Sequence, residues 1–454
     1  RINADFIDNS AGMDCSDHEV NIKIALAAAV KGRRLSRARR DRLLVDMTED
    51  VAALVLEDNR LQTLALSIAE RGGAAAMATH IGLIERLEIA GHLDRGTEGL
   101  ADGETLARRA HEGSGLTRPE LAVLLSTAKL ALQAAIEESA LPDDPLHGDL
   151  LRSGFPAPMR GPFAAYIRAH PLRREIVATR LANRIVNRLG LIHPFELAEE
   201  EGADLAAVAQ GFAVADALFD LSSLWERLET AAMPEQARLL LLERMAMAVR
   251  GHVADLLRVG AGQVPGRVML DRLRRGVGEL VRAEDRLALS GGSVAAHRLV
   301  ATLVEAGVPD AEAGAVGNLF ALDGAAGIVD PAVGAKIPPA PAAPALRALG
   351  EKLALDWAQG AAAHRDPSDP WERLLVSGLA RDFQHMRIAF LGGLLRQEDA
   401  RRDPVAAIGD WAVRHAQAIN QFRAMNARAR NAVSPVTLAQ IANQARNLLS
   451  LRNH

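Results

Sequence analysis

Apolar residues recur every three or four positions along most of the chain, which is the spacing of amphipathic helices. In residues 50–70 this register is carried by Leu54, Leu61, Leu64 and Ile68, and the two glycines that follow predict the end of a helix. Aromatic residues make up 3% of the chain, which disfavours strand-rich folds. The pattern therefore predicts a mainly α protein.

Helix-start signals locate several of these helices. Thr117 and Glu120 have the spacing of a capping box, with Pro119 in the first turn, which predicts a helix to about residue 139. Ser434 precedes Pro435 in the same way at the start of a last helix. Further helices are predicted over residues 171–189, ended by a glycine, and from residues 204, 234 and 293.

The amino end is the one place where a strand is predicted. Ile2, Ala4 and Phe6 alternate with polar neighbours, and turn-forming residues occupy positions 8–12. Ser16 or Asp17 then provides an N-cap for a helix to about residue 30. This strand, turn and helix predict a short α/β piece at the amino end, followed by a large irregular helical domain.

Proline-rich segments suggest the divisions of that helical domain. Residues 142–162 are predicted to form a proline-rich connector, and residues 331–344, in which Ala and Pro alternate, a linker that cannot continue a helix. The resulting division is a terminal piece over residues 1–30, a helical domain over 31–335 and a helical lobe over 345–454.

Composition narrows the classes of protein. Hydrophobic residues at 49% and charged residues at 24% exclude a disordered chain. The net charge of -4 gives no general attraction to nucleic acid or to a membrane, and charges interrupt each apolar stretch before the roughly 20 residues that cross a bilayer. Cys15 is the single cysteine, so we expect a reducing, cytoplasmic setting. Because the first residue is Arg1 and not Met, we also expect a piece of a longer protein.

The predicted turn into the first helix is the leading candidate site. Free N–H groups at a helix N-terminus attract a carboxylate or phosphate, Ser16 adds a hydroxyl, and Gly12 allows the backbone to approach closely. The amide of Asn9 lies nearby in sequence. The carboxylates of Asp14 and Asp17 oppose a free anion there. A simple capped turn is the alternative that local geometry favours.

Two other readings of this segment fail on their chemistry. Cys15 beside His18 suggests a thiol nucleophile, but the negative charges of Asp14 and Asp17 raise the pKa of a thiol. His18 and the following glutamate begin like a zinc-protease motif, yet Ile22 occupies the place of the second histidine. The scattered histidines elsewhere lack the spacing of metal ligands.

The remaining candidates also have ordinary explanations. The arginine-rich residues 33–42 lack the interleaved aromatics that bind bases, so we expect a solvated surface or an intersubunit patch. Gly260, Gly262 and Gly266 have the wrong spacing for a dinucleotide loop. None of the five lysines lies in a glycine-rich turn, so no catalytic lysine is predicted.

Four segments carry a resemblance to a known family. Residues 3–24, 61–67, 116–126 and 173–183 resemble, in order and spacing, the large bacterial NAD-specific glutamate dehydrogenases. The resemblance covers the chain to about residue 230 and beyond that consists mainly of helical character. It implies that residues 1–30 are a short terminal piece of a nucleotide-binding α/β domain. It also implies oxidative deamination of L-glutamate to 2-oxoglutarate and ammonia, with hydride passing to NAD.

The same resemblance assigns roles at the amino end. Smaller glutamate dehydrogenases carry a motif N-x-G-G-V-x-x-S, and Asn9, Ala11, Gly12, Met13 and Ser16 stand at its positions. It implies that Asn9 and Gly12 lie at the cofactor, with Asn9 also near the substrate, and that Ser16 binds the side-chain carboxylate of glutamate. Ala11 for glycine and Met13 for valine are departures that the backbone tolerates.

The resemblance also indicates what this chain lacks. The catalytic Lys and Asp and the glycine-rich cofactor loop of the family match nothing here, so we expect the chain to be inactive alone and to belong to a homo-oligomeric parent enzyme. The alternative is a non-enzymatic helical scaffold or partner-binding module, in which the first turn merely caps a helix.

Overall fold

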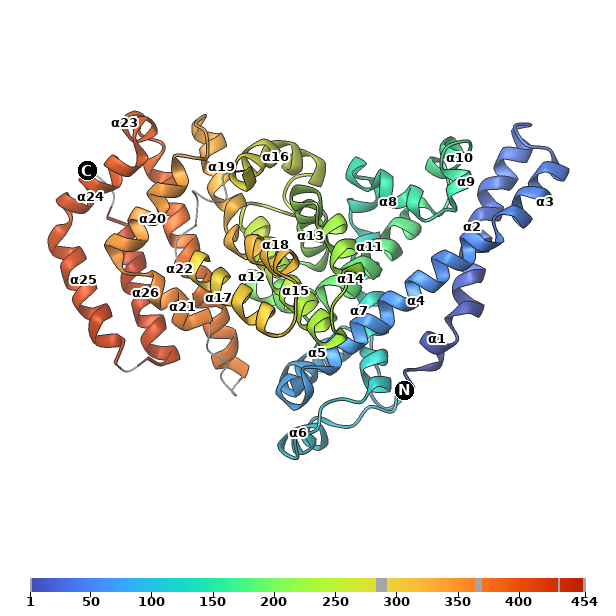
Figure 1. Cartoon of the computed structure of the whole chain (residues 1–454), viewed down its shortest axis with the longest axis horizontal. Coiled ribbons are helices and arrows are strands. Elements are labelled where there is room, and N and C mark those ends of the chain that lie inside the picture. Colours follow the sequence, from blue (N-terminus) through green and yellow to red (C-terminus); the bar gives the residue numbers. More distant parts are fainter. Residues whose placement is uncertain (1, 283–291, 364–369, 432, 452–454) are drawn as a thin grey trace. The chain divides into compact units, whose positions relative to one another are not determined.

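The computed structural model describes residues 2–282, 292–363, 370–431 and 433–451 (Figure 1). Nearly every segment of this described part is helical, as the apolar spacing predicts. It holds no strand, and the one isolated β-bridge joins Ala261 and Val264. The prediction of a mainly α protein is confirmed.

Two compact units divide the chain. The first comprises Arg1–Ala213 with Pro265–Arg267, and the second comprises Val214–Val264 with Val268–His454. The boundary predicted at residues 335–345 lies inside the second unit.

The predicted linker over residues 331–344 is helical at both of its ends. Pro331 lies inside α19 (Ala325–Ala335), and six residues separate this helix from α20 (Ala342–Leu353). Ala332, Ala342 and Ala343 are at most 2% exposed, so packing at these ends outweighs the poor helix propensity of proline. Most of the six residues between the two helices are exposed, and the helix is interrupted there, as the alternation of Ala and Pro predicts.

Helices of the first unit follow one another with short connections. They are α1 (Asp5–Asp8), α2 (Ser10–Lys31), α3 (Arg37–Asp46), α4 (Thr48–Glu70), α5 (Met77–Ile89), α6 (Gly103–His111), α7 (Arg118–Glu138), α8 (Gly148–Ser153), α9 (Ala157–Arg160), α10 (Ala164–Arg168), α11 (Arg173–Leu189) and α12 (His193–Glu201). Short 3₁₀ helices lie at Gly73–Ala76, Leu141–Asp143 and Pro145–His147. The predicted proline-rich connector over residues 142–162 consists largely of short helices.

The second unit continues the helical pattern, and α13 (Leu205–Phe219) and α16 (Gly266–Arg282) contain residues of both units. Its other helices are α14 (Leu221–Thr230), α15 (Glu235–Arg258), α17 (Gly292–Glu305), α18 (Asp310–Ala321), α19, α20, α21 (Asp356–Ala363), α22 (Pro370–Leu394), α23 (Glu398–Arg402), α24 (Pro404–Arg414), α25 (Ala416–Ala429) and α26 (Pro435–Leu449). The predicted Ser434 cap is confirmed, since its hydroxyl accepts the N–H of Thr437 at 3.1 Å.

The strand predicted over residues 2–7 is wrong. These residues lead into α1, and only Asn9 separates α1 from α2. A strand needs a neighbour to satisfy its backbone, and the described residues offer none, whereas in the helical turn the N–H of Asn9 reaches the carbonyl of Asp5 at 2.8 Å. Ile7 is then fully buried and Ile2 is 77% exposed.

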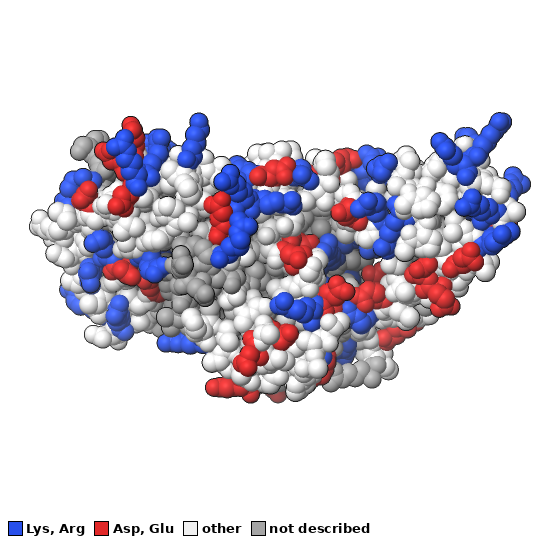
Figure 2. All heavy atoms as spheres, turned by 45° about the horizontal axis from the view of Figure 1, so that its top comes forward, with Lys and Arg blue, Asp and Glu red and all other residues white. Residues whose placement is uncertain are grey.

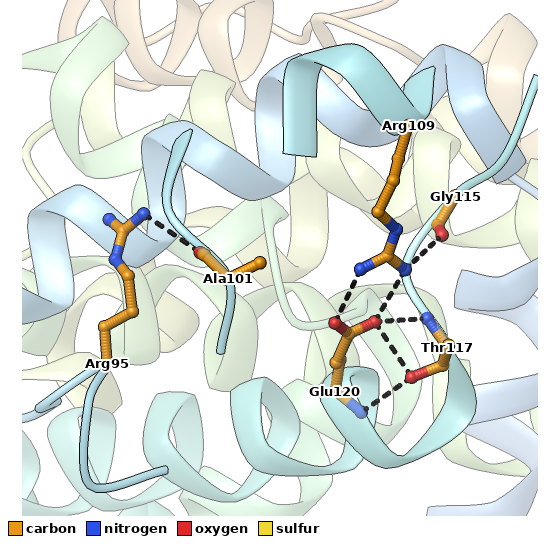
Figure 3. A network of polar contacts seen from close by, with 6 residues as sticks. All are labelled: Arg95, Ala101, Arg109, Gly115, Thr117 and Glu120. Atoms are coloured by element: carbon orange, nitrogen blue, oxygen red, sulfur yellow. Dashed lines mark hydrogen bonds and ion pairs between the residues drawn. The ribbon is translucent and has the colours of Figure 1, made fainter. Parts of the chain in front are cut away.

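The capping box at the start of α7 is confirmed (Figure 3). The hydroxyl of Thr117 accepts the N–H of Glu120 at 3.4 Å, and the Glu120 carboxylate accepts the N–H of Thr117 at 2.7 Å. Arg109 donates to both carboxylate oxygens, at 2.8 and 2.9 Å, and to the carbonyl of Gly115 at 3.0 Å. This arginine thus anchors α6 to the first turn of α7.

One residue further along, Arg118 joins three separate segments of the first unit. Its Nε donates to the Asn3 side chain at 2.9 Å, and another nitrogen contacts Ser67 at 3.2 Å and Glu70 at 3.0 Å. Its last nitrogen donates to the carbonyl of Thr63 at 3.3 Å. Since Arg118 is only 9% exposed, the amino end, α4 and α7 are held together by one nearly buried guanidinium.

By length and composition, α7 alone among the described helices could cross a membrane, and α12 with α13 could do so only as one bent pair. Core helices of folded domains meet the same test. In this unit α7 packs against α4 and α11 and buries Leu121, Leu125 and Leu132. Packing in the core therefore accounts for its apolar character.

Arg118→Met is expected to lower the stability of the first unit by about 3 kcal/mol, because the carbonyl and carboxylate that the guanidinium now satisfies would lose their donor. Hydrogen exchange of α4 and α7 measures this loss. Fluorescence of the four tryptophans, all in the second unit, should change little. If the exposed variant Arg42→Met accelerated exchange as much, Arg118 would have no special role.

Candidate functional site

The helix that contains the predicted site residues begins earlier than expected. Ser10 is the first residue of α2, so Ser16 lies in the helix interior and Gly12 in its first turn. Asn9 takes the N-cap position, but its side chain makes no capping hydrogen bond. The predicted anion site at a helix N-terminus beside Ser16 is therefore wrong, because the backbone N–H groups there are used within the helix.

The outer face of α2, which we define by Gly12, Met13, Ser16 and Val20, lies on the surface of the first unit. Gly12 and Ser16 are exposed, and Met13 and Val20 are 71% and 47% exposed. No atom lies within 4 Å of the position that a Cβ on Gly12 would take. The structure thus brings Gly12 and Ser16 together, one turn apart, on an open surface.

The opposite face of α2 is buried. Ile22, Ala25, Leu26 and Ala29 are at most 2% exposed and belong to a core cluster with side chains of the α8–α11 region. In Figure 1, α2 and α4 lie side by side, and α2 also packs on α10. This packing fixes which face of α2 remains open.

A pocket of about 300 Å³ lies under the first half of α2, and we call it the α2–α11 pocket. Its polar lining comes from α2, α4 and α11 and consists of Asp14, Asp17, His18, Asn21, Asp58, Glu175, Thr179, Arg180 and Asn183. Its volume is enough for several water molecules or a small ligand.

Two carboxylates and an imidazole meet inside this pocket. Nε2 of His18 lies 3.7 Å from an oxygen of Asp14 and 3.9 Å from an oxygen of Asp58. Burial raises the pKa of Asp14, and the negative charge of Asp58 raises it further, while His18 opposes the change. Sequence reasoning missed Asp58 because it lies on α4, forty residues away along the chain.

Sequence reasoning also missed Lys129, which lies on α7 and is only 8% exposed. Burial lowers the pKa of its ammonium to about 7, against the opposing pull of the negative charges of Asp58 and Asp14. None of the described ion pairs shorter than 4 Å includes it. The available signal was a single lysine inside the apolar run of residues 121–136, where a charge is costly.

Arg180 completes the polar lining from α11. Burial lowers the pKa of its guanidinium, an effect that Asp58 and Asp14 oppose. One nitrogen donates to the hydroxyl of Ser153 at 3.4 Å, whereas the buried Nε has no hydrogen-bond partner among the described residues. The pocket therefore offers an incompletely satisfied donor.

The arginine-rich segment lies on the surface, as expected for a solvated patch. Arg33, Arg34, Arg37, Arg39 and Arg42 are all exposed. Figure 2 shows positive side chains gathered at the end of the first unit that α2 and α3 form, with acidic side chains close by. Arg40 pairs with Asp41 at 2.5 Å, so part of this charge is compensated locally.

Lys129→Met is expected to remove a pH dependence of stability. Between pH 7 and 10.5 the folded protein holds Lys129 neutral while the unfolded chain is protonated, so the unfolding free energy of the wild type should rise with pH relative to the variant. The slope is at most about 1.4 kcal/mol per pH unit. Urea unfolding across this range measures it.

Lys23→Met is the matched control, since the Lys23 side chain is 55% exposed on α2. Its stability should follow the wild type at every pH. Parallel pH profiles for the wild type and Lys129→Met would show that Lys129 keeps its ordinary pKa.

Comparison with known proteins defines the family to which this chain belongs. Residues 113–450 match the family model described as "Glutamate dehydrogenase, C-terminal". Residues 1–69, which include α2 and most of α4, match the model described as "Bacterial NAD-glutamate dehydrogenase, catalytic domain". The chain belongs to the family of bacterial NAD-dependent glutamate dehydrogenases, and the resemblance read from its segments is confirmed.

Individual relatives agree with this assignment. The NAD-specific glutamate dehydrogenase of Halomonas elongata is 32% identical over 423 residues, covering 91% of this chain and 26% of the relative. That of Pseudomonas aeruginosa is 32% identical over 451 residues, covering 99% and 28%. That of Mycobacterium tuberculosis is 38% identical over 234 residues, covering 52% and 14%. The chain thus spans about a quarter of the length of the first two relatives.

Proposed function

We propose that this chain is the C-terminal part of an NAD-dependent glutamate dehydrogenase, which converts L-glutamate, NAD and water to 2-oxoglutarate, ammonia and NADH. In this proposal the outer face of α2 forms one wall of the active site. The hydroxyl of Ser16 hydrogen-bonds the side-chain carboxylate of glutamate, and Asn9 and Gly12 lie at the cofactor.

The observation that carries the proposal is the exposure of this face. Residues 1–69 match a catalytic-domain model, yet Met13 and Val20 lie open on the surface of the first unit. Apolar side chains grouped on one exposed helix face are typical of a surface that is covered in the working protein. We take the covering partner to be the remainder of the catalytic region, as in the longer relatives.

The residues at this face fit the groups that they would contact. The space around Gly12 allows a flat ring to approach the backbone closely, which a side chain would prevent. NAD, when bound, accepts the hydride from glutamate. Ser16 would orient the substrate through a charge-assisted hydrogen bond, so that its reacting carbon is held toward the cofactor.

No position of this chain is assigned to the catalytic lysine and aspartate of the family, so the proposal places them in the part of the longer relatives that this chain does not match. The chain alone should then show no glutamate-dependent reduction of NAD. In a fusion protein, the part of the Pseudomonas aeruginosa relative that precedes the matching segment is joined to the amino end of this chain. This fusion should restore turnover.

We expect the active form to be a cytoplasmic homo-oligomer, as the resemblance and the single cysteine imply. The proposal involves neither nucleic acid nor a membrane.

A non-enzymatic helical scaffold is the competing function. Turnover by residues 1–454 alone would contradict the proposed division of the active site. A correctly folded fusion without any activity would favour the scaffold.

Ser16→Ala in the fusion enzyme should raise the KM for glutamate about tenfold, because one hydrogen bond to a charged group contributes roughly 1.5 kcal/mol. The KM for NAD should change little. Ser36→Ala is the control, since that serine only caps α3 through the N–H of Arg39. An unchanged KM for glutamate in Ser16→Ala would show that Ser16 does not bind the substrate carboxylate.

A further inference from the structure

The buried face of α2 carries a group of side chains that the proposed reaction does not use. Asp14 and His18 are one helical turn apart, so both point to the same side of α2, and Asp58 meets them from α4. Successive residues of a helix turn by about 100°, which places Ser16 on the opposite side of α2 from these two. The group is therefore separate from the outer face.

The spacing of the three side chains suits the coordination of one metal ion. Nε2 of His18 lies 3.7 and 3.9 Å from the two carboxylates, which is too long for hydrogen bonds. One ligand atom from each residue lies within 4.8 Å of the others. Ligands bound to one ion at about 2.1 Å are roughly 3 to 4 Å apart, so small side-chain movements would bring all three into contact with it.

His18 is the second, independent observation. It is only 8% exposed, and its ring nitrogens hydrogen-bond to none of the residues that the structure describes. The His18 side chain is 10% exposed, lines the pocket and points at two carboxylates without hydrogen-bonding to either, so its nitrogen is left for a ligand inside the pocket. An ion between them would satisfy all three groups.

The charge of the surroundings allows a cation. Asp14, Asp17, Asp58 and Glu175 all line the α2–α11 pocket, against one guanidinium from Arg180. Counting the ammonium of Lys129, which interacts electrostatically with Asp58 and Asp14, four negative charges still face two positive ones. The pocket of about 300 Å³ gives an ion a route in and leaves room for water as further ligands.

We propose that Asp14, His18 and Asp58 bind one divalent transition-metal ion of the zinc or manganese class. One imidazole nitrogen with two carboxylates suits these ions better than Ca²⁺ or Mg²⁺, which prefer oxygen ligands alone. The ion joins α2 to α4 and so holds in place the helix whose other face carries Ser16. Its role is structural, since no proposed reacting group lies on that side of α2.

Calorimetric titration of the chelator-treated full chain with Zn²⁺ tests the site. The wild type should bind one Zn²⁺ saturably, and Asp58→Asn and His18→Gln should each weaken that binding at least about tenfold, as expected for loss of a direct ligand. Asp17→Asn is the matched control, because Asp17 lines the same pocket outside the group, and its affinity should equal that of the wild type.

Co²⁺ provides a readout of the nitrogen ligand. The visible absorption of bound Co²⁺ should change in His18→Gln and remain in Asp17→Asn. Zn²⁺ should raise the Tm of the wild type and of Asp17→Asn but not that of Asp58→Asn, a variant of nearly unchanged shape. The proposal would be overturned if the wild type showed no saturable Zn²⁺ binding. It would also be overturned if Asp58→Asn and His18→Gln bound Zn²⁺ as tightly as Asp17→Asn.

Discussion

The structure of the first unit depends on the two unlike faces of α2. Ile22, Leu26 and Ala29 bury the far half of this helix almost completely in a core shared with the α8–α11 region. Hydrophobic burial of that face determines the rotation of α2 about its own axis, and the rotation leaves Met13 and Ser16 on the surface. Both proposals for this chain, a substrate wall outside and an ion site inside, require this one orientation.

Two buried basic side chains on α7 support the same orientation of α2. Arg118 and Lys129 are 11 residues apart, three helical turns, and so lie on one side of α7. Arg118 satisfies oxygen atoms of α4 and the amino end through four hydrogen bonds, whereas Lys129 faces the carboxylates of Asp14 and Asp58 without a close ion pair. Arg118 therefore forms a fixed structural contact, whereas the charge of Lys129 depends on pH.

Local signals in the sequence predicted those parts of the fold that local interactions determine. The Thr117 capping box and the Ser434 cap are both present, because a cap needs only three or four adjacent residues. The prediction of a strand over residues 2–7 was wrong, because a strand needs a distant partner. The predicted linker failed at its two ends, where helices extend into it and packing of Ala332 and Ala342 outweighed the helix-breaking effect of Pro331.

The same distinction applies to the sites. The resemblance of four segments, residues 3–24 among them, correctly indicated the family, but the predicted helix start placed Ser16 at a helix terminus, whereas α2 begins at Ser10. The lone lysine in the apolar run of residues 121–136 was a signal for Lys129, but its proximity and that of Asp58 to Asp14 could not be predicted, since it arises only when α2, α4 and α7 pack together.

The central claim is that the remaining catalytic region covers the outer face of α2. Hydroxyl-radical footprinting of Met13 tests it directly, with Met247, which is 36% exposed, as the reference. Met13 should oxidise rapidly in residues 1–454 alone and be strongly protected in the active fusion enzyme, whereas equal oxidation in both would contradict the account.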